Sequence, residues 1–133
     1  MTYLNQISLQ DVLTLLNNLL KYTMKERNLI TIEPILNEVK EHLKKIYGKK
    51  LKQIILYGSY ARGEASEGSD IDLIILLSDM ADPITEREKF FDVICRLDLK
   101  YDTVISVLPL KENQYRVRRL PLIANVKKEG ISL

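Results

Sequence analysis

Hydrophobic positions near the start of the chain recur every three or four residues, which is the spacing of an amphipathic helix. The first such stretch, LQDVLTLLNNLLKY, covers residues 9–22. Its apolar positions are Leu9, Val12, Leu13, Leu16, Leu19 and Leu20. A second stretch predicts a helix over about 34–47, with Thr31 as its cap, Pro34 in its first turn and Gly48 at its end. The pattern therefore predicts two separate helices before residue 48.

The middle of the chain carries short runs of β-forming residues, which predict three strands. These runs are QIILY (53–57), DIDLIILL (70–77) and TVISVLP (103–109), the last of which ends at a proline. A helix is predicted between the second and third strands, over about 84–98, with Ile84, Phe91, Ile94 and Leu97 facing inward. A helix around 120–128 and an extended end complete the pattern. This order predicts an α/β (α+β) fold in which helices flank a small mixed sheet.

Composition and charge narrow the class of protein without choosing a function. At 133 residues, with 46% hydrophobic and 29% charged residues, the chain fits one globular domain. Its net charge of +2 is too small to indicate nucleic-acid or membrane binding by itself, and there is no apolar run of about 18 residues. The single cysteine, Cys95, excludes an internal disulfide. We expect a soluble domain in a reducing cytoplasm, with neither a membrane nor a nucleic acid as its partner.

Two aspartates open the predicted strand 70–77 and give the first indication of chemistry. Asp70 and Asp72 are two positions apart on a strand, so their side chains point to the same face, with Cα atoms roughly 6.6 Å apart. Paired carboxylates on an otherwise apolar strand are unfavourable unless a cation lies between them. Mg²⁺ or Mn²⁺ suits such oxygen ligands. The alternative is a solvated acidic edge at the start of a strand.

A Gly-Ser pair follows the predicted strand 53–57. Gly58 lets the backbone approach a ligand closely, and backbone N–H groups that open a helix favour a phosphate. The Ser59 hydroxyl would add a further donor. Alone, the pair is equally compatible with a plain turn. Combined with the aspartates, it predicts a phosphate cradle and a metal pair at two neighbouring strand ends.

The full motif resembles the signature of the DNA polymerase β-type nucleotidyltransferases, and most closely that of the minimal nucleotidyltransferase (MNT) branch. The residues that carry the resemblance are Gly58-Ser59-x-Ala61-Arg62-Gly63 and Ser69-Asp70-x-Asp72-Leu73. The resemblance covers about residues 34–133 and implies a palm-like nucleotidyltransferase fold. We therefore predict a nucleotidyltransferase domain over 31–133, preceded by an N-terminal helical extension over 1–30.

The resemblance also implies nucleotidyl transfer, most simply of AMP from ATP, with two bound divalent ions. Gly58 and Ser59 would contact the triphosphate, and Ser69 belongs to the same nucleotide-binding motif. Asp70 and Asp72 would hold Mg²⁺ (or Mn²⁺). For Arg62, two roles are open. It would either steady a phosphate or form a salt bridge with the nearby Glu64 or Glu67.

Members of the family carry a third carboxylate on a later strand, which binds metal and activates the attacking hydroxyl. The corresponding position falls near Val104, which has no carboxylate. Asp102 lies two residues earlier and would share that face if the strand 103–109 extended back to it. It would then be the third catalytic and metal-binding acid. The alternative is a loop acid before the strand. Asp98, at the end of the preceding helix, is expected to be out of reach.

The resemblance implies a partner protein, because the chain is too short to contain the substrate domains of larger relatives. MNT proteins are commonly the antitoxins of HEPN toxins, which they neutralise by AMP transfer to a hydroxyl or by binding. The rival hypothesis is therefore a catalytically weak module that acts by binding. The leucine-rich stretch 9–22 would be either part of the fold or a docking face. The sequence leaves open the nucleotide, the acceptor and the oligomeric state, including a homo-oligomer.

Overall fold

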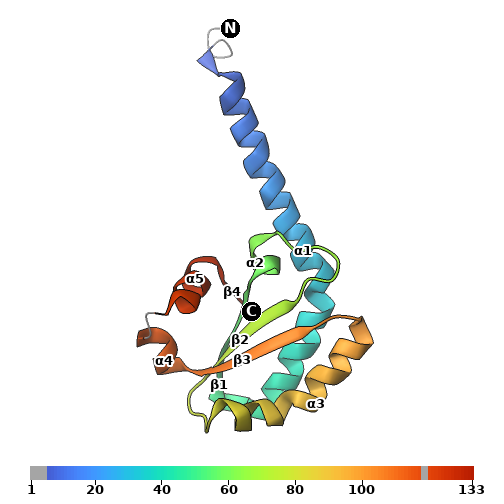
Figure 1. Cartoon of the computed structure of the whole chain (residues 1–133), viewed down its shortest axis with the longest axis vertical. Coiled ribbons are helices and arrows are strands. Elements are labelled where there is room, and N and C mark those ends of the chain that lie inside the picture. The colour runs from blue at the N-terminus through green and yellow to red at the C-terminus, as the bar shows by residue number, and fades with distance from the viewer. Residues whose placement is uncertain (1–5, 118–119) are drawn as a thin grey trace.

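A four-stranded mixed sheet forms the centre of the protein, seen here in a computed structural model that describes residues 6–117 and 120–133 (Figure 1). The strands are β1 (Leu51–Tyr57), β2 (Ile71–Leu77), β3 (Ile105–Lys111) and β4 (Ile131–Ser132). Their order across the sheet is β3-β2-β1-β4. β1 is antiparallel to β2 and β4, whereas β2 and β3 are parallel. The predicted mixed α/β architecture is confirmed.

The helices lie on both faces of this sheet. They are α1 (Leu9–Tyr47), α2 (Ser59–Arg62), α3 (Pro83–Tyr101), α4 (Glu112–Val117) and α5 (Pro121–Glu129), with a 3₁₀ turn, η2 (Gly48–Lys50), between α1 and β1. One part of the core packs the sheet against α1 and α3, and a smaller part packs it against α4 and α5. No helix among the described residues is both long enough and apolar enough to cross a membrane.

β2 is the central strand, and its sequence reflects burial on both faces. Leu73 and Ile75 pack in the core under α1 and α3, whereas Ile74 and Leu76 pack on the side of α4 and α5. A strand covered on both faces reads as a continuous apolar run rather than an alternating one. This is why β2 was visible in the sequence to within one residue of its start.

The two helices predicted before residue 48 are one continuous helix, so the predicted break near Thr31 is wrong. Thr31 does not cap a helix; its hydroxyl donates to the Arg27 carbonyl oxygen inside α1 at 2.8 Å. Pro34 lies within the helix and is exposed, so the Ile30 carbonyl that it leaves without a donor can reach water. The true N-cap is Ser8, which shares a reciprocal capping box with Asp11.

Helix α3 is longer than predicted, and its buried face is turned relative to the prediction. Phe90, Ile94 and Leu97 are buried, whereas Ile84 and Phe91, which were expected to face inward, are 69% and 63% exposed. Adjacent positions on a helix point about 100° apart, so choosing Phe91 rather than Phe90 displaced the predicted face by that angle. The prediction was right for Ile94 and Leu97 and wrong for the other two.

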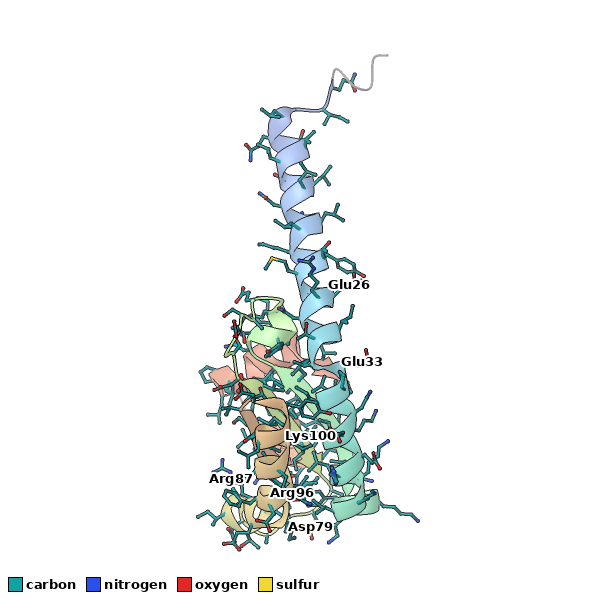
Figure 2. The ribbon with its side chains drawn as sticks, turned by 90° about the vertical axis from the view of Figure 1, so that its right-hand side faces the viewer. Glu26, Glu33, Asp79, Arg87, Arg96 and Lys100 are labelled. Carbon is teal, nitrogen blue, oxygen red and sulfur yellow. The ribbon has the colours of Figure 1, made fainter. Side chains whose placement is uncertain are left out.

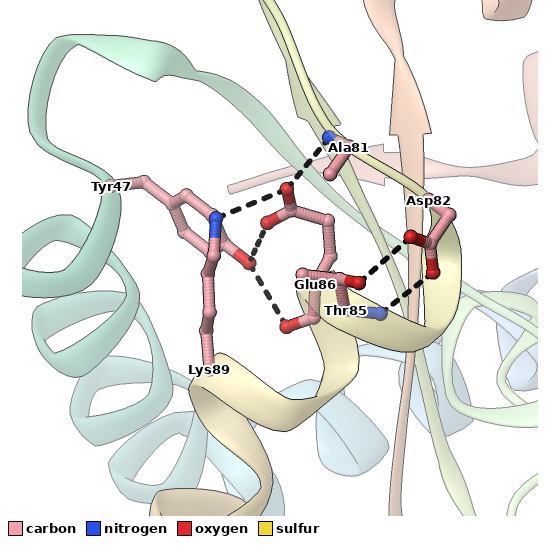
Figure 3. A network of polar contacts seen from close by, with 6 residues as sticks. All are labelled: Tyr47, Ala81, Asp82, Thr85, Glu86 and Lys89. Carbon is pink, nitrogen blue, oxygen red and sulfur yellow. Dashed lines mark hydrogen bonds and ion pairs between the residues drawn. The ribbon is translucent and has the colours of Figure 1, made fainter.

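The same face of α3 buries a carboxylate, Glu86, which is 1% exposed. It accepts hydrogen bonds from the Tyr47 hydroxyl at 3.0 Å, the Ala81 backbone N–H at 3.1 Å and the Lys89 ammonium at 3.2 Å (Figure 3). Burial raises the pKa of Glu86, but these donors outweigh burial and hold the pKa below its usual range. The network joins the end of α1 to the start of α3.

Strand β3 begins later than predicted and also ends later. Asp102 ends α3 in the left-handed conformation, with φ 48°, so the extended strand cannot include it. The Asp98 carboxylate accepts from the Ile105 backbone N–H at 2.8 Å, at the point where the strand starts. At the other end, β3 continues through Pro109 to Lys111. A proline is tolerated there because β3 is an edge strand.

The first half of α1 projects from the domain like an arm (Figures 1 and 2). We call residues 9–24 the arm. All of its apolar side chains are exposed, including Leu9 at 75% and Leu16 at 54%. The helix then joins the domain where Lys25 lies against Gly63. The stretch 9–22 is thus not part of the core, and the predicted boundary at residue 30 falls within a continuous helix.

Candidate active site

The antiparallel pairing of β1 with β2 brings the two halves of the motif together. Tyr57, the last residue of β1, pairs with Asp72 near the start of β2. Gly58 and Ser59 follow Tyr57 directly, and Asp70 precedes Ile71, the first residue of β2. The Gly-Ser pair and both aspartates therefore lie at the same end of the sheet, in neighbouring strands.

Gly58 is required at its position by backbone conformation and by space. Its φ is 77°, in the region that favours glycine. A Cβ at Gly58 would also collide with the Asp72 carboxylate. The absence of a side chain thus allows the backbone that starts α2 to approach a carboxylate closely.

A cleft of about 600 Å³ opens over these residues. Its walls include every predicted site residue except Asp102, together with residues of β1 and α5. The lining residues are Tyr57, Gly58, Ser59, Arg62, Ser69, Asp70, Asp72, Leu122, Asn125, Val126 and Glu129. The contribution of α5 was missed from the sequence, because nothing in the pattern of residues 121–129 places that helix over the end of β2.

The two aspartates differ in environment. Asp70 is exposed and Asp72 is half-buried. Burial raises the pKa of Asp72, the charge of Asp70 raises it further, and Arg62 partly opposes both effects. Burial and then the charge of Asp72 likewise raise the pKa of the neighbouring Tyr57. Negative charge at this end of the cleft is therefore incompletely balanced, and a bound cation would relieve it.

Arg62 forms ion pairs in the structure, which was one of the two roles left open. Its Nε donates to Glu64 Oε2 at 3.0 Å, and its Nη1 lies 3.6 Å from Glu129 Oε2. These pairs raise the pKa of Arg62, with the Glu64 hydrogen bond as the largest cause. The Arg62–Glu129 pair links α2 to α5 across the cleft. Both Arg62 and Glu64 are exposed, so Arg62 could give up its ion pairs and bind a ligand instead.

The loop between α2 and β2 is fixed at two points. Within it, the Ser66 backbone N–H donates to Ser69 Oγ at 2.9 Å. From outside, the Asn28 side chain of α1 binds both backbone groups of Ala65, donating to its carbonyl at 3.2 Å and accepting from its N–H at 3.1 Å. Asn28 was not singled out from the sequence, where it is one polar residue among many. The loop that leads into Asp70 is thus held by the helix that carries the arm.

The predicted third acid, Asp102, does not line the cleft that holds the aspartate pair. Ser106 of β3 is the residue that pairs with Asp72. Asp102 lies in a loop and lines a different cleft, of about 640 Å³, together with Tyr60 and Tyr101. Asp102 was expected to share the face of β3 only if the strand reached back to it, and that condition is not met because the strand starts at Ile105. Among residues 6–117 and 120–133, no group of three acidic, histidine or cysteine side chains is arranged to hold a metal.

Asp98, which was expected to be out of reach of the aspartate pair, is bound to the backbone at the start of β3. Burial raises the pKa of Asp98, the Ile105 N–H lowers it, and the charge of Asp70 raises it. The negative charges of Asp98 and Asp70 therefore repel each other, although the Asp98 carboxylate already accepts a hydrogen bond at the start of β3. In the structure, Asp98 accepts a hydrogen bond from the backbone N–H of Ile105.

The donor set at the pair fits a single hard cation. Two carboxylates with incompletely balanced charge, beside a backbone that a glycine keeps open, match the way Mg²⁺ is held by one or two carboxylates plus substrate phosphates. A second ion would need further oxygen ligands from the nucleotide or the acceptor.

Comparison with known proteins identifies the class. Residues 36–131 match the nucleotidyltransferase domain family, which covers more than half of the chain. The chain therefore belongs to the nucleotidyltransferase family, and it is an enzyme of the MNT type. The match begins after the arm and includes all the strands that build the cleft.

Individual relatives are consistent with this class. A protein of Methanocaldococcus jannaschii, named "putative protein adenylyltransferase", is 40% identical over 59% of this chain and 78% of its own length. The protein adenylyltransferase MntA of Thermococcus cleftensis is 33% identical over 56% of this chain and 74% of its own length. A crystal structure of a toxin–antitoxin with AMP-PNP has a TM-score of 0.52 and 25% identity, covering 72% of this chain and 69% of that chain.

Proposed function

We propose that this chain transfers AMP from ATP to a hydroxyl of a partner protein of the HEPN type, as the antitoxin of a toxin–antitoxin pair. The observation that carries the proposal is the cleft, in which a close-approaching glycine backbone faces a pair of carboxylates whose charge calls for a cation. The names of the relatives and the AMP-PNP complex of the structural neighbour support the choice of ATP and of a protein acceptor.

The chain's own residues would bind and orient the nucleotide. Backbone N–H groups after Gly58 and the Ser59 hydroxyl would donate to the triphosphate. Asp70 and Asp72 would hold Mg²⁺, whose chemistry is to neutralise charge on the phosphates during in-line displacement of pyrophosphate from the α-phosphorus by the acceptor hydroxyl. Ser69, in the loop fixed by Ser66 and Asn28, would keep Asp70 in place. Arg62 would exchange its exposed partners Glu64 and Glu129 for a phosphate.

Deprotonation of the acceptor is the step with the least support in the fold, because Asp102 lies outside the cleft. The role of Asp102 and the presence of a second ion stay predictions. This observation favours a second candidate function, in which the chain binds Mg-ATP and neutralises its partner by binding, with slow or absent transfer.

Label transfer separates the two functions. The chain, copurified with its partner, is incubated with Mg²⁺ and α-labelled ATP, and Asp70→Asn/Asp72→Asn is tested beside it. A matched control, Asp79→Asn/Asp92→Asn, removes the same number of charges at two exposed positions outside the cleft. We expect label on the partner with the wild type and the control, and none with the Asp70/Asp72 variant. Bound ATP and bound partner without label in the wild type would support the binding module.

A further inference from the structure

The arm carries a wide apolar stripe that no other element of the described chain covers. Five residues within it illustrate the exposure: Leu9 75%, Leu13 45%, Leu16 54%, Leu19 63% and Leu20 60%. Monomeric proteins seldom expose a contiguous row of large apolar side chains, and such a surface indicates an interaction site. Figure 2 shows the side chains of this part of α1 standing free of the domain.

The stripe points away from the domain. Positions 18 residues apart on an α-helix are five turns apart and so face the same way. Asn17 and Lys21 therefore face as Ile35 and Val39 do, and these two are buried against the domain. By the same count, Leu16 faces as the exposed Pro34 does. The polar side of the arm continues the domain-facing side of α1, and its leucines continue the outer side.

Because the apolar side of the arm faces away from the domain, the chain's own domain cannot cover the stripe. Bending the arm toward the domain would bring down its polar side, with Asn17 and Lys21, and leave the leucines outside. A membrane surface is also a poor match, because helices that lie on membranes are rich in Lys and Arg on their polar face. From 9 to 24 the sequence has one lysine, Lys21, and one acid, Asp11.

We propose that the stripe binds the same stripe of a second copy of this chain, which makes the protein a dimer joined through its arms. Leu9, Leu13, Leu16 and Leu20 follow the four-three-four spacing of helices that pack side by side. The stripe contains no charge, so two copies meet without repulsion. The outward direction of the stripe places the two domains on opposite sides of the paired arms. The cleft at the end of β1 and β2 includes no stripe residue and remains open.

The area of the stripe supports a weak dimer. Six exposed apolar side chains lie within about 90° of the line through these four leucines: Leu9, Val12, Leu13, Leu16, Leu19 and Leu20. They are between 40% and 75% exposed, so covering them would remove on the order of 300 Å² per copy, at roughly 60–120 Å² for a fully exposed side chain. Standard interfaces bury about 800 Å² per partner. We therefore expect a weak dimer that forms at high micromolar concentration rather than an obligate one.

Sedimentation velocity of the full chain at low and high micromolar concentration tests this proposal. We expect the wild type to shift with concentration from 15.4 kDa toward twice that mass. Leu16→Glu/Leu20→Glu should stay a monomer throughout. A matched control, Thr14→Glu/Asn18→Glu, adds the same charges on the polar side of the arm and should dimerise as the wild type does. Circular dichroism of all three checks that the domain is folded.

Three results would overturn the proposal. One is a wild type that stays monomeric at the highest concentration, which would assign the stripe to a different protein. Another is co-sedimentation of that monomer with phosphatidylglycerol vesicles, which would assign it to a lipid surface. The last is a Leu16→Glu/Leu20→Glu variant that dimerises as well as the control, which would place the interface elsewhere. None of these results depends on nucleotide transfer.

Discussion

Leu43 and Leu16 lie on the same continuous helix, yet Leu43 is fully buried and Leu16 is 54% exposed. The two halves of α1 have similar apolar spacing, but their apolar sides face in nearly opposite directions. In the second half, that side packs on the sheet and α3; in the first half, it faces away from the domain. The comparison teaches that apolar periodicity predicts a helix and its apolar side, but not which partner covers that side.

The largest expected difference is in stability. Leu43→Ala should lower the free energy of unfolding by about 3 kcal/mol, because it removes a buried side chain and leaves a cavity. Leu16→Ala should change it by less than about 0.5 kcal/mol, because the side chain is already in water. Urea denaturation measures both changes in the free energy of unfolding, at protein concentrations low enough to keep the chain monomeric. Equal losses would mean that the arm is folded onto the domain in solution.

The second half of α1 is also anchored by a charge, through Tyr47 and Glu86. Glu86→Gln should cost about 2 kcal/mol at neutral pH, because hydrogen bonds to a buried carboxylate are lost or weakened. The pKa of Glu86 is lowered in the folded state, so its contribution is complete above the unfolded pKa of about 4.5 and disappears as the pH falls through the folded value. The difference between wild type and variant should therefore narrow in acid.

Unfolding monitored across pH values measures that difference. Glu88→Gln, at an exposed position of the same helix, is the matched control and should stay close to the wild type at every pH. A Glu86→Gln difference that widened in acid would contradict the direction of the pKa shift.

The junction between the halves reaches the site through Asn28. Asn28→Ala should lower the free energy of unfolding by about 1.5 kcal/mol, because both backbone groups of Ala65 lose their partner. It should also slow nucleotide transfer, since the loop before Asp70 is less constrained. If Asn28 has this positioning role, kcat should fall while partner binding remains. Asn37→Ala, at an exposed position of α1, should leave both quantities unchanged.

The smallest effect is expected where the helix passes through Pro34. Pro34→Ala should raise the free energy of unfolding by about 1 kcal/mol, because it restores a donor for the Ile30 carbonyl and removes the clash of the proline ring. The greater freedom of the unfolded chain without the proline offsets part of this gain. Thermal unfolding measures this change. A loss of stability would show that the proline is favourable where it stands.

The sequence predicted the motif region well because its residues are constrained locally. The spacing of Gly58-Ser59 from Asp70 and Asp72 is fixed within one β-turn-β unit, so neighbouring positions in the chain become neighbouring positions in the fold. β2 was found from its apolar run. The family match and the sheet order agree with that prediction.

The misses occurred where distant elements decide the outcome. The expected break near Thr31 depended on local propensity, which tertiary packing of Ile32 and Ile35 overrides. Asp102 was expected to share the face of β3 only if that strand reached back to it, and nothing local reveals that α3 continues to Tyr101. Likewise, Asn125 and Glu129 enter the cleft only because α5 returns across the end of β2. Each of these three features depends on which elements pack together in the folded chain.

Pro109, inside the outermost strand, has a consequence for unwanted self-association. An open strand edge can recruit the edge of another molecule and seed aggregates. Proline has no N–H to offer there, so the free side of β3 lacks a donor in the middle of its length. On the opposite edge, the two-residue β4 leaves little to extend. The sheet is therefore poorly suited to fibre-like growth, even in a chain that exposes so many leucines elsewhere.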